Sequence, residues 1–380
     1  MPRRVATEPF AKEVVPSKAA GAPLKEFGKF QLHDPDHWIG STIQSRYQIL
    51  DKIGSGGTGT VYRAVDKRNG DFVAIKLMPL SDGTREKVVP LSECFRLLRE
   101  MKAAMMMIHP NIVKTKDVGV FMGNIYIVME HLQGEDLSKL IRRENGIPWE
   151  HARDIILRIC DGLDALHKKG IVHRDLKPSN IFIANENGKE VVKLIDFGLV
   201  KFTGTTARER NLTDSDDVVG TPAYISPEMA RGEEVNDPRS DLYSLGVTLY
   251  ELMSGSLPFK ARNYFELFDM HNNAKPPPLR EKRPYLDIPF TLEAIIMKAL
   301  EKNPKDRYQS VAELRAAVEC LPYETKLNPL ARLAEFFKIA FGGAYFLLRS
   351  DDVIGNLDLN LSKGAFDSID KSAYGHEIGF

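Results

Sequence analysis

A short glycine-rich stretch constrains the fold of this chain more than any other feature. Residues 53–61 read IGSGGTGTV, and Gly54, Gly56 and Gly59 have the G-x-G-x-x-G spacing that lets backbone N–H groups close on a phosphate. The residues that follow, TVYRAV, favour a strand, whereas a dinucleotide-binding turn leads into a helix. The stretch therefore predicts a flap made of strand, turn and strand. The spacing alone is also compatible with a turn that binds nothing, and Asp71 could imitate the distal acid of a dinucleotide site.

The composition is that of an ordinary globular protein without a bias toward a charged partner. The chain has 380 residues, of which 43% are hydrophobic and 27% are charged. At about 150 residues per domain, this length indicates two lobes with extensions. Lys plus Arg and Asp plus Glu both total 52, so the formal net charge is +0 and we predict no nucleic-acid partner.

The cysteines and the apolar runs bear on the cellular compartment. Cys94, Cys160 and Cys320 are too few and too widely spaced for a disulfide framework or a zinc site, which fits a reducing compartment. No apolar stretch reaches about 18 residues, so we predict no transmembrane helix. No apolar run follows the N-terminal arginines, which disfavours a secretory signal. We therefore expect a cytoplasmic protein, with delivery into another cell as the alternative.

Changes in sequence texture divide the chain into four segments. An N-terminal arm without a sustained period precedes a small lobe of strands with one helix, and a larger, mainly helical lobe precedes a C-terminal extension. The boundaries are expected at 1–46 for the arm, 47–132 and 133–321 for the lobes, and 322–380 for the extension. The arm is expected to be mostly disordered, with its end pinned by Phe27, Phe30 or Trp38, and the lobes meet at a hinge near residues 130–136.

The small lobe is expected to contain five strands and a helix. It begins with YQIL, TVYRAV and DFVAIKLM, and Asn69-Gly70 predicts a two-residue hairpin turn between the second and third strands. Apolar residues at three- and four-residue spacing then predict a helix that stops at Pro110, and IVKTKDVGV and NIYIVMEHL complete the lobe. The helical stripe consists of Phe95, Leu98, Met101, Met105 and Ile108.

The large lobe is expected to be built from five helices, each with an apolar face. Loops and strands are expected instead around IVHRDLKPSNIFI and VVKLIDFGLV. The predicted helical segments are DLSKLIRREN, WEHARDIILRICDGLDALHKKG, PRSDLYSLGVTLYELMSG, LEAIIMKALEKN and VAELRAAVECL.

Four short motifs follow the glycine-rich stretch in order. VAIK places Lys76 on the third strand, HRDLKPSN spans 173–180, DFG spans 196–198 and SPE spans 226–228. With these motifs in register, residues 47–321 resemble the eukaryotic-like (Hanks-type) serine/threonine protein kinases, and GTPAYISPE is similar to the bacterial branch. The resemblance implies an α+β, bilobal protein kinase fold with a small β-sheet-plus-helix N-lobe and a larger, mostly helical C-lobe. It also implies transfer of the ATP γ-phosphate to Ser and Thr hydroxyls of protein substrates.

The resemblance implies a lysine that holds the nucleotide and an acid that holds the lysine. Phosphoryl transfer needs the γ-phosphate, the metal and the hydroxyl to be held in line. Lys76 would pair with the α- and β-phosphates. Glu100 lies nine residues before His109, the offset usual in the family, and is preferred over Glu93 as the partner of Lys76. The alternative for either acid is a place on a solvated helix face.

Three further residues are implied at the reacting hydroxyl. Asp175 would accept or orient the proton of the substrate hydroxyl, and Lys177 would neutralise the transferring phosphate. Thr221 would hydrogen-bond near Asp175 and shape the substrate site. Lys177 in DLKPSN and Thr221 in GTPAY resemble the serine/threonine pattern, whereas the tyrosine-specific branch usually has DLAARN or a variant there.

The implied cofactors are ATP and a divalent cation. Asn180 and Asp196 would supply hard oxygen ligands, which suit Mg²⁺, with Mn²⁺ as an alternative. The adenine would lie against apolar residues that could equally be plain core, with hydrogen bonds from the backbone of Glu130 and Leu132 and with Asp136 near the ribose. The nucleotide-binding set consists of Ile53, Gly54, Ser55, Gly56, Gly57, Thr58, Gly59, Val61, Ala74, Lys76, Met129, Glu130, Leu132, Asp136 and Phe182.

Four residues are implied to act as scaffold. His173 is expected to be structural rather than an acid or base, because its place in the motif lies under the DFG turn. Asp241 is expected to anchor the backbone of the catalytic loop, and Glu228 is expected to pair with Arg307.

A long polar loop between DFG and SPE offers sites for regulation. Arg174 directly precedes Asp175, which in this family commonly accompanies control by phosphorylation of the activation loop. We expect autophosphorylation at Thr213 and/or Ser215, with a transient dimer for that step and no assignment of the stable oligomer. The alternative is a loop of solvated hydroxyls, in which Asp216-Asp217 already supplies the negative charge. Lesser candidates for modification are Thr203, Thr205 and Thr206.

The C-terminal extension lies outside the resemblance. Its apolar stripe over residues 333–348 is interrupted at Gly342-Gly343 and carries charges, which disfavours a bilayer span. Packing on the helical lobe or on a partner is expected, and interfacial membrane contact is the alternative. A flotation assay with and without residues 330–380 separates these two interpretations.

Three rival functions are weaker. A pseudokinase scaffold would carry degraded motifs, but Lys76, Glu100, Asp175, Asn180 and Asp196 are intact. The strand predicted after the glycines disfavours a nucleotide-dependent oxidoreductase. Small-molecule kinases of related fold generally lack a segment like GTPAYISPE.

Overall fold

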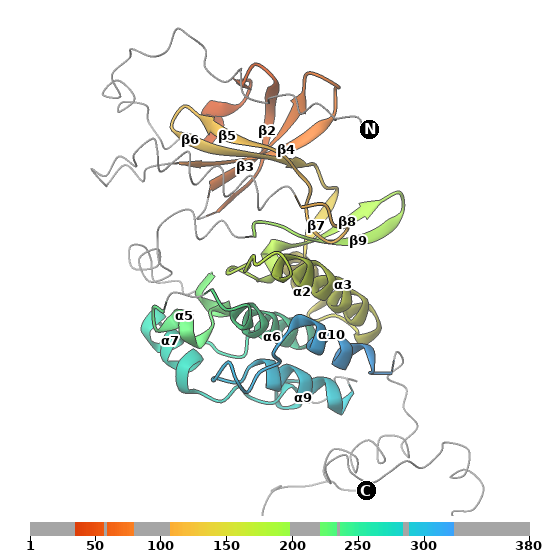
Figure 1. Ribbon diagram of the computed structural model, residues 1–380, viewed down its shortest axis with the longest axis vertical. Helices are drawn as coiled ribbons and strands as arrows, with labels where there is room; N and C mark the ends of the chain where they lie inside the picture. Colours follow the sequence, from red (N-terminus) through yellow and green to blue (C-terminus); the bar gives the residue numbers. More distant parts are fainter. Residues whose placement is uncertain are drawn as a thin grey trace, which may run out of the picture. The chain divides into compact units, whose positions relative to one another are not determined.

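The described part of the chain contains a six-stranded antiparallel sheet, a smaller three-stranded sheet and a set of helices (Figure 1). The computed structural model describes residues 35–56, 59–79, 107–197, 221–233, 236–283 and 289–322. The large sheet has the strand order β1-β2-β3-β4-β6-β5, and the small one has the order β7-β8-β9. The strands are β1 (Thr42–Ile43), β2 (Tyr47–Gly56), β3 (Gly59–Asp66), β4 (Phe72–Pro79), β5 (Thr115–Phe121), β6 (Asn124–Glu130), β7 (Gly134–Asp136), β8 (Ile181–Glu186) and β9 (Lys189–Leu194).

The glycine-rich stretch connects two paired strands, which confirms the predicted flap. β2 runs into the glycines, and Gly56 lies opposite Gly59 at the start of β3. Gly59 has a φ of 139°, and a Cβ there would collide with the carbonyl oxygen of Leu77, so its backbone requires glycine. Gly54 and Gly56 have neither a left-handed φ nor a neighbour within 4 Å of an added Cβ.

The alternation of side chains in the central strands separates two cores. On β6, Tyr126 and Val128 belong to a cluster within the large sheet, whereas Ile125 and Ile127 join the larger cluster that continues into the helices. Successive side chains of a strand point to opposite faces. Lys76 on β4 therefore lies on the face opposite Ile75, which is in the sheet cluster.

The chain before β2 adds to the edge of the large sheet. A 3-10 turn, η2 (Pro35–Trp38), precedes β1, which pairs antiparallel with β2. The Trp38 ring lies 5.8 Å from the Phe121 ring, centroid to centroid, so Trp38 pins this end as expected. Phe27 and Phe30 lie outside the described residues.

The β3–β4 hairpin exists, but the predicted two-residue turn at Asn69-Gly70 is wrong. A type I′ turn needs a positive φ at both central residues, and of these two only Gly70 has one. β3 ends at Asp66 and β4 begins at Phe72, so five residues separate the two strands. The Asp66 N–H donates to the Asp71 carbonyl at 2.9 Å across this loop. The longer loop forms because the Asp66 carboxylate accepts the Arg68 N–H at 3.1 Å, and Asp66 also binds the Arg46 guanidinium.

Two expectations around Pro110 are also wrong. Ile108, expected on the apolar face of a helix, is not helical and is 87% exposed. The pyrrolidine ring disfavours helical backbone at the preceding residue, so a helix has to end before His109. The strand expected from Ile112 starts at Thr115, because Ile112 instead bridges to Leu194 of β9. The other residues of the stripe lie outside the described part.

All five predicted helices are present, and the described residues contain three further helices that were not foreseen. In Figure 1, α3, α6, α9 and α10 lie alongside one another, and contacts join α3 to α6, α6 to α9, α9 to α10 and α10 to α3. The unforeseen helices are α5, α7 and α8. The helices are α2 (Leu137–Glu144), α3 (Trp149–His167), α5 (Pro227–Ala230), α6 (Arg239–Ser254), α7 (Tyr264–Asn273), α8 (Leu279–Lys282), α9 (Phe290–Ala299) and α10 (Val311–Glu319).

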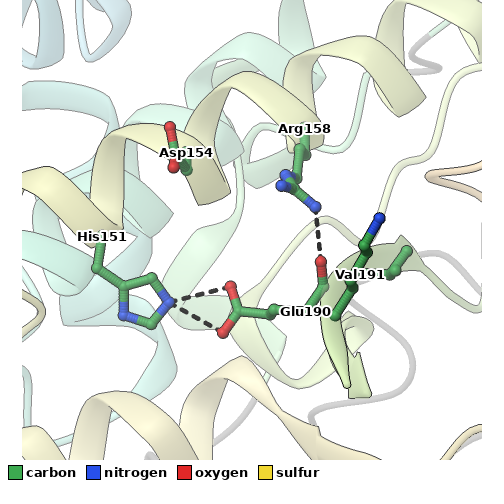
Figure 2. Close-up of a pocket in the computed structure, with 6 residues that line it drawn as sticks. His151, Asp154, Arg158, Glu190 and Val191 are labelled. Carbon is green, nitrogen blue, oxygen red and sulfur yellow. Dashed lines mark hydrogen bonds and ion pairs between the residues drawn. The ribbon is translucent and has the colours of Figure 1, made fainter. Parts of the chain in front are cut away.

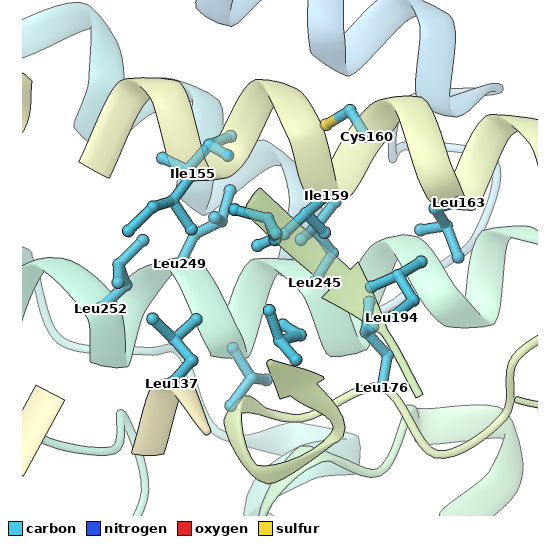
Figure 3. Close-up of a cluster of buried hydrophobic side chains, with 14 of the residues drawn as sticks. Leu137, Ile155, Ile159, Cys160, Leu163, Leu176, Leu194, Leu245, Leu249 and Leu252 are labelled. Atoms are coloured by element: carbon cyan, nitrogen blue, oxygen red, sulfur yellow. The ribbon is translucent and has the colours of Figure 1, made fainter. Parts of the chain in front are cut away.

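The helical core is centred on α3 and α6. Figure 3 shows Ile155 and Ile159 of α3 facing Leu245 and Leu249 of α6, with Leu194 of β9 beside them. The expected apolar residues of α6 are buried, and so is almost every other residue of this helix. A helix surrounded by protein has no solvent-facing side to keep polar.

Candidate active site

β4, the loop after α3 with its 3-10 turn, and the segment after β9 bring five of the predicted catalytic and metal residues together. Lys76 lies on β4, Asp175 and Lys177 lie in the loop after α3, and Asn180 ends the 3-10 turn η3 (Pro178–Asn180). Asp196 follows β9. The Ile195 N–H donates to the Asn180 carbonyl at 2.9 Å, which joins the segment that carries Asp196 to the loop.

An ion pair connects the large sheet to the segment after β9. The Lys76 Nζ lies 2.7 Å from the Asp196 Oδ2, although 120 residues separate the two in the chain. The Lys76 side chain is 3% exposed and the Asp196 side chain is 22% exposed. The pair therefore has a buried cationic end and a carboxylate that solvent reaches.

A second cluster surrounds Asp175. The Lys177 Nζ lies 3.0 Å from Asp175 Oδ1 and 2.9 Å from Oδ2. The Asn180 Nδ2 donates to the Asp175 carbonyl at 2.7 Å and to its Oδ2 at 3.0 Å. These contacts fix the orientation of the carboxylate. They also commit both N–H groups of the Asn180 amide, so its oxygen is the atom that can bind a cation.

The backbone of this loop is held in a strained conformation. Arg174 has a φ of 66° and Asp196 a φ of 60°, a left-handed conformation that costs a residue with a Cβ about 1–3 kcal/mol. Asp241 stabilises the first of these, because its carboxylate accepts the His173 N–H at 2.7 Å and the Arg174 N–H at 2.8 Å. The His167 Nε2 binds the same carboxylate at 2.8 Å. The predicted anchoring role of Asp241 is confirmed.

His173 is buried directly before this strained residue. Its side chain is fully buried, and within the described residues neither ring nitrogen has a hydrogen-bond partner. Burial lowers the pKa of His173, which keeps the imidazole neutral. A ring without access to solvent cannot reach a substrate, which agrees with the structural role expected from the sequence.

A buried ion pair secures the helical region. The Arg307 guanidinium binds both carboxylate oxygens of Glu228, at 2.9 and 2.8 Å. This contact confirms the pair expected from the sequence. Desolvation opposes ionisation of Glu228, but the hydrogen bonds and the positive charge of Arg307, with smaller contributions from the backbone and Ser226, together outweigh it and lower the pKa of Glu228.

The residues expected around adenine lie on neighbouring strands. Ala74 pairs with Met129 across β4 and β6, and Val61 pairs with Lys76 across β3 and β4. Phe182 pairs with Asp136 in the small sheet. Ile53 is half exposed on β2, and Met129 and Leu132 pack against the larger core.

Asp136 has a local structural role that the sequence analysis did not assign. It is the N-cap of α2, and its Oδ1 accepts the Lys139 N–H at 3.2 Å. Capping uses one carboxylate oxygen, so an approach to a ribose stays a prediction.

Sequence analysis also missed the side-chain contacts of Glu130. The Glu130 Oε1 lies 3.0 Å from the Nζ of Lys193, a buried residue of β9. The only sequence signal for this contact is a lysine inside an apolar strand, VVKLI.

Some predicted site residues cannot be placed. Gly57, Thr58, Glu100, Thr213 and Ser215 lie outside the described residues. Thr221 begins the 3-10 turn η5 (Thr221–Tyr224), and its side chain also lies outside the description.

A surface cavity of about 520 Å³ lies away from these residues, between α3 and β9 (Figure 2). Two of the charged side chains at its wall, His151 and Glu190, are paired with each other. The His151 Nε2 is 3.0 Å from both Glu190 carboxylate oxygens, and Arg158 donates to the Glu190 carbonyl at 2.7 Å. Arg158 thereby covers a backbone acceptor of the edge strand β9, which is a structural role.

Two absences hold for the described residues. None of the helices placed there is both long and apolar enough to cross a bilayer. No group of three or more His, Cys, Asp or Glu side chains in the same ranges could hold a metal ion by itself. Mg²⁺ often takes only one or two protein carboxylates and completes its shell with phosphate oxygens and water, so Asn180 and Asp196 fit such an ion.

Comparison with known proteins gives a consistent result. The model of the family "Protein kinase domain" matches residues 47–318. Serine/threonine-protein kinase pkn3 of Myxococcus xanthus is 36% identical over 295 residues, which cover 77% of this chain and 53% of that protein. Serine/threonine-protein kinase PknB of Mycobacterium leprae is 36% identical over 278 residues, covering 72% and 42%. The chain spans about half the length of the curated relatives it matches.

Solved structures show the same fold. The kinase domain of Mycobacterium tuberculosis PknI is 25% identical with a TM-score of 0.56, covering 74% of this chain and 97% of that one. Rad53 1-466 in complex with AMP-PNP is 25% identical with a TM-score of 0.58, covering 71% and 64%.

Proposed function

The chain belongs to the protein kinase domain family, and from this premise we propose that it transfers the γ-phosphate of ATP to serine and threonine hydroxyls of proteins. The observation that carries the proposal is the Lys76–Asp196 pair at 2.7 Å, joined through Asn180 to the cluster around Asp175. A cation for phosphates, oxygen ligands for a metal and a carboxylate for a hydroxyl proton thus occur in one place.

Each residue has a distinct role in the proposed transfer. The oxygen of the substrate hydroxyl bonds to the γ-phosphorus of ATP, and Asp175 takes the hydroxyl proton. At the same time the bond between the γ-phosphorus and the β–γ bridging oxygen breaks, which releases ADP. Lys177, 2.9 Å from Asp175, stabilises the negative charge on the transferring group. Lys76 holds the α- and β-phosphates, and Glu100 is proposed to hold Lys76.

Asn180 and Asp196 are proposed to hold a divalent cation. When bound, such an ion supplies positive charge that bridges phosphate oxygens. We propose Mg²⁺ as the ion, because one carboxylate and one amide oxygen are the hard ligands it accepts, and Mn²⁺ has similar ligand preferences.

Two features of the structure support nucleotide binding near β2. Gly54 and Gly56 need glycine neither for their φ nor for neighbouring atoms of the chain. A phosphate bound close to their backbone would explain why both residues are glycine, because a Cβ would occupy the space of the phosphate. Two neighbouring pairs also support the proposed nucleotide contacts: Ala74, on β4 with Lys76, pairs with Met129, and Phe182, two residues after Asn180, pairs with Asp136.

Phosphate transfer by the purified chain tests this proposal. With γ-labelled ATP, Mg²⁺ and a protein acceptor, the wild-type chain should place label on serine and threonine. Asp175→Asn should reduce the rate by about 10²- to 10⁴-fold, because it removes the general base. Asp154→Asn, which alters an aspartate on the wall of the α3–β9 cavity, is the matched control and should keep the wild-type rate. A wild-type chain as slow as Asp175→Asn would leave only a scaffold role.

Regulation by the activation loop is a further part of the proposal. Arg174 adjoins Asp175, and its guanidinium donates to Asn236. A phosphate adds about −1.5 to −2 charge and could compete for this arginine. Replacing Thr213 and Ser215 with alanine should lower the activity. An unchanged rate in the double variant would remove this part of the proposal.

A further inference from the structure

A buried lysine on β9 connects the small sheet to the end of β6. The Lys193 side chain is 8% exposed, and its Nζ lies 3.0 Å from Glu130 Oε1 and 3.2 Å from Glu186 Oε1. Burial alone would lower the pKa of Lys193, but the hydrogen bonds with the two carboxylates outweigh it and raise the pKa. Lys193 is therefore a buried cation with two anionic partners.

The two partners lie in different parts of the molecule. Glu186 is on β8, in the same hairpin as Lys193, and its side chain is 47% exposed. Glu130 is the last residue of β6 in the large sheet, and its side chain is 25% exposed. Of the two ion pairs of Lys193, the one with Glu130 is therefore the one that joins the two sheets.

Glu130 is held in place from one side. Its Oε1 accepts the Lys114 N–H at 2.9 Å, and its own N–H donates to the Lys114 carbonyl at 3.0 Å. Together with Lys193, these contacts engage the Oε1 atom and the N–H of Glu130. They fix the position of the peptide that continues to Leu132, where the proposed adenine contacts lie.

The strand that carries Lys193 also leads to the proposed metal ligand. Lys193 lies opposite Phe182 in the β8–β9 pair, so the two side chains project from the same face of the small sheet. Three residues after Lys193 comes Asp196, which binds Lys76 at 2.7 Å. The Lys193–Glu130 and Lys76–Asp196 pairs are thus two ionic connections from one segment to the large sheet.

We infer that Lys193 is a positioning residue for the nucleotide, which braces the β6 end at Glu130 against β9 so that the adenine edge and the phosphate end keep a fixed separation. The inference rests on the proposed function, because it names a residue that acts through the proposed ATP site. A lysine that served only to complete the β8–β9 hairpin would depend on Glu186 instead.

Nucleotide affinity, measured by calorimetry with ADP and Mg²⁺, separates these roles without requiring transfer. Lys193→Met should weaken binding about tenfold, which corresponds to about 1.4 kcal/mol, because Glu130 loses its buried partner. Glu130→Gln should weaken it similarly, and the double variant should be no weaker than either single one. Lys193→Arg should retain most of the affinity. Glu186→Gln is the matched control and should stay within about twofold, because an exposed pair contributes little.

The effect of Lys193→Met on the KM for ATP should match its effect on the affinity for ADP. In an active chain, Lys193→Met should raise the KM for ATP about tenfold and change kcat less than about threefold, because the residue acts on binding.

Thermal unfolding of each variant shows whether it is folded, and Lys193→Arg tests the inference if Lys193→Met does not fold. An affinity of Lys193→Met equal to wild type, or a loss reproduced by Glu186→Gln, would overturn the inference. If the wild-type chain binds ADP but transfers no phosphate, the proposed function fails while the affinities still test Lys193. If the wild-type chain binds no nucleotide, both fail.

Discussion

The molecule contains two clusters of charged residues that differ in how completely the protein uses them. In the scaffold cluster, Arg307 is fully buried, and the Glu228 side chain it binds is 6% exposed. In the catalytic cluster, Lys76 is as deeply buried, but its partner Asp196 is 22% exposed. The two ion pairs have one property in common: each joins a motif residue to an oppositely charged residue that is distant in the sequence.

The difference lies in hydrogen-bonding capacity. Arg307 donates from Nε to the Glu301 carbonyl, from Nη1 to Glu228 and the Arg239 carbonyl, and from Nη2 to Glu228 and the Lys302 carbonyl. These five bonds use all five N–H groups of a guanidinium. Asp196 meets Lys76 through one oxygen and is open to solvent, so its carboxylate can accept a further ligand. A saturated cluster stabilises the fold, and an unsaturated one can bind.

Removing the catalytic lysine should give the largest effect on activity. In Lys76→Met, the proposed transfer rate should fall about 10²- to 10³-fold, because a preorganised positive charge at the phosphates is lost. The free energy of unfolding should change by less than about 1 kcal/mol, since Asp196 remains in contact with water. Rate and urea denaturation measured together check both parts. Lys67→Met, on the exposed β3–β4 loop, is the control, and a large loss of stability in Lys76→Met would place this pair with the scaffold.

Removing the scaffold arginine should give the opposite pattern. Arg307→Met should lower the free energy of unfolding by about 3–5 kcal/mol, because it leaves Glu228 buried without a partner. The double variant with Glu228→Gln should recover part of this loss, because no buried charge remains. Nucleotide affinity of the folded variant should stay near wild type. Stability unchanged by Arg307→Met would contradict the saturated-cluster interpretation.

Buried histidines should make the scaffold sensitive to mild acid. Burial, with a smaller effect of Lys302, lowers the pKa of His271 from 6.5 to about 3. The unfolded chain therefore binds a proton that the folded chain excludes, so stability is present above pH 6.5 and falls as the pH falls below it. As the pH falls from 6.5 to 4.5, the loss of stability due to His271 should steepen from about 0.7 to about 1.4 kcal/mol per pH unit.

Glu228 of the scaffold cluster does not lose its contribution to stability in this pH window. The pKa of Glu228 is lowered from 4.5, so the loss from this group comes only at lower pH. Urea denaturation at several pH values between 6.5 and 4.5 measures the slope. A His271→Gln variant should show a shallower slope, and His151→Gln, at the surface cavity, is the control. Equal slopes in wild type and His271→Gln would contradict the prediction.

The smallest expected effect separates capping from binding at Asp136. Serine is also a good N-cap, so Asp136→Ser should keep the stability of α2 within about 0.5 kcal/mol, whereas Asp136→Ala should lose about 1 kcal/mol. If Asp136 approaches the ribose as predicted, Asp136→Ser should weaken ATP binding while the unfolding midpoint stays the same. Equal affinity in Asp136→Ser and wild type would leave capping as the only role of this residue.

The sequence predicts the features that depend on motif order or on local backbone preference. The strand after Gly59 follows from a run of β-formers, and Glu228–Arg307 and the anchoring by Asp241 follow from the resemblance. These contacts are found because the motifs carry both partners.

Contacts decided by tertiary structure were not predictable in the same way. Lys193 has no local signal, since its partner Glu130 lies 63 residues earlier and the pairing exists only once β6 and β9 are placed. The turn at Asn69-Gly70 was mispredicted because Asp66, bound to Arg46, organises a longer loop. Burial on all sides of α6 likewise depends on the elements packed around it rather than on its own period.

Magnesium-dependent nucleotide binding tests the comparison of the two clusters most directly. Calorimetry of the wild-type chain with ADP should detect binding that strengthens with Mg²⁺, and Asp196→Asn should remove the magnesium dependence, while the conservative scaffold variant Glu228→Gln keeps it. Binding that is absent, or equally dependent on magnesium in wild type and Asp196→Asn, would contradict the assignment of the unsaturated cluster as the nucleotide site.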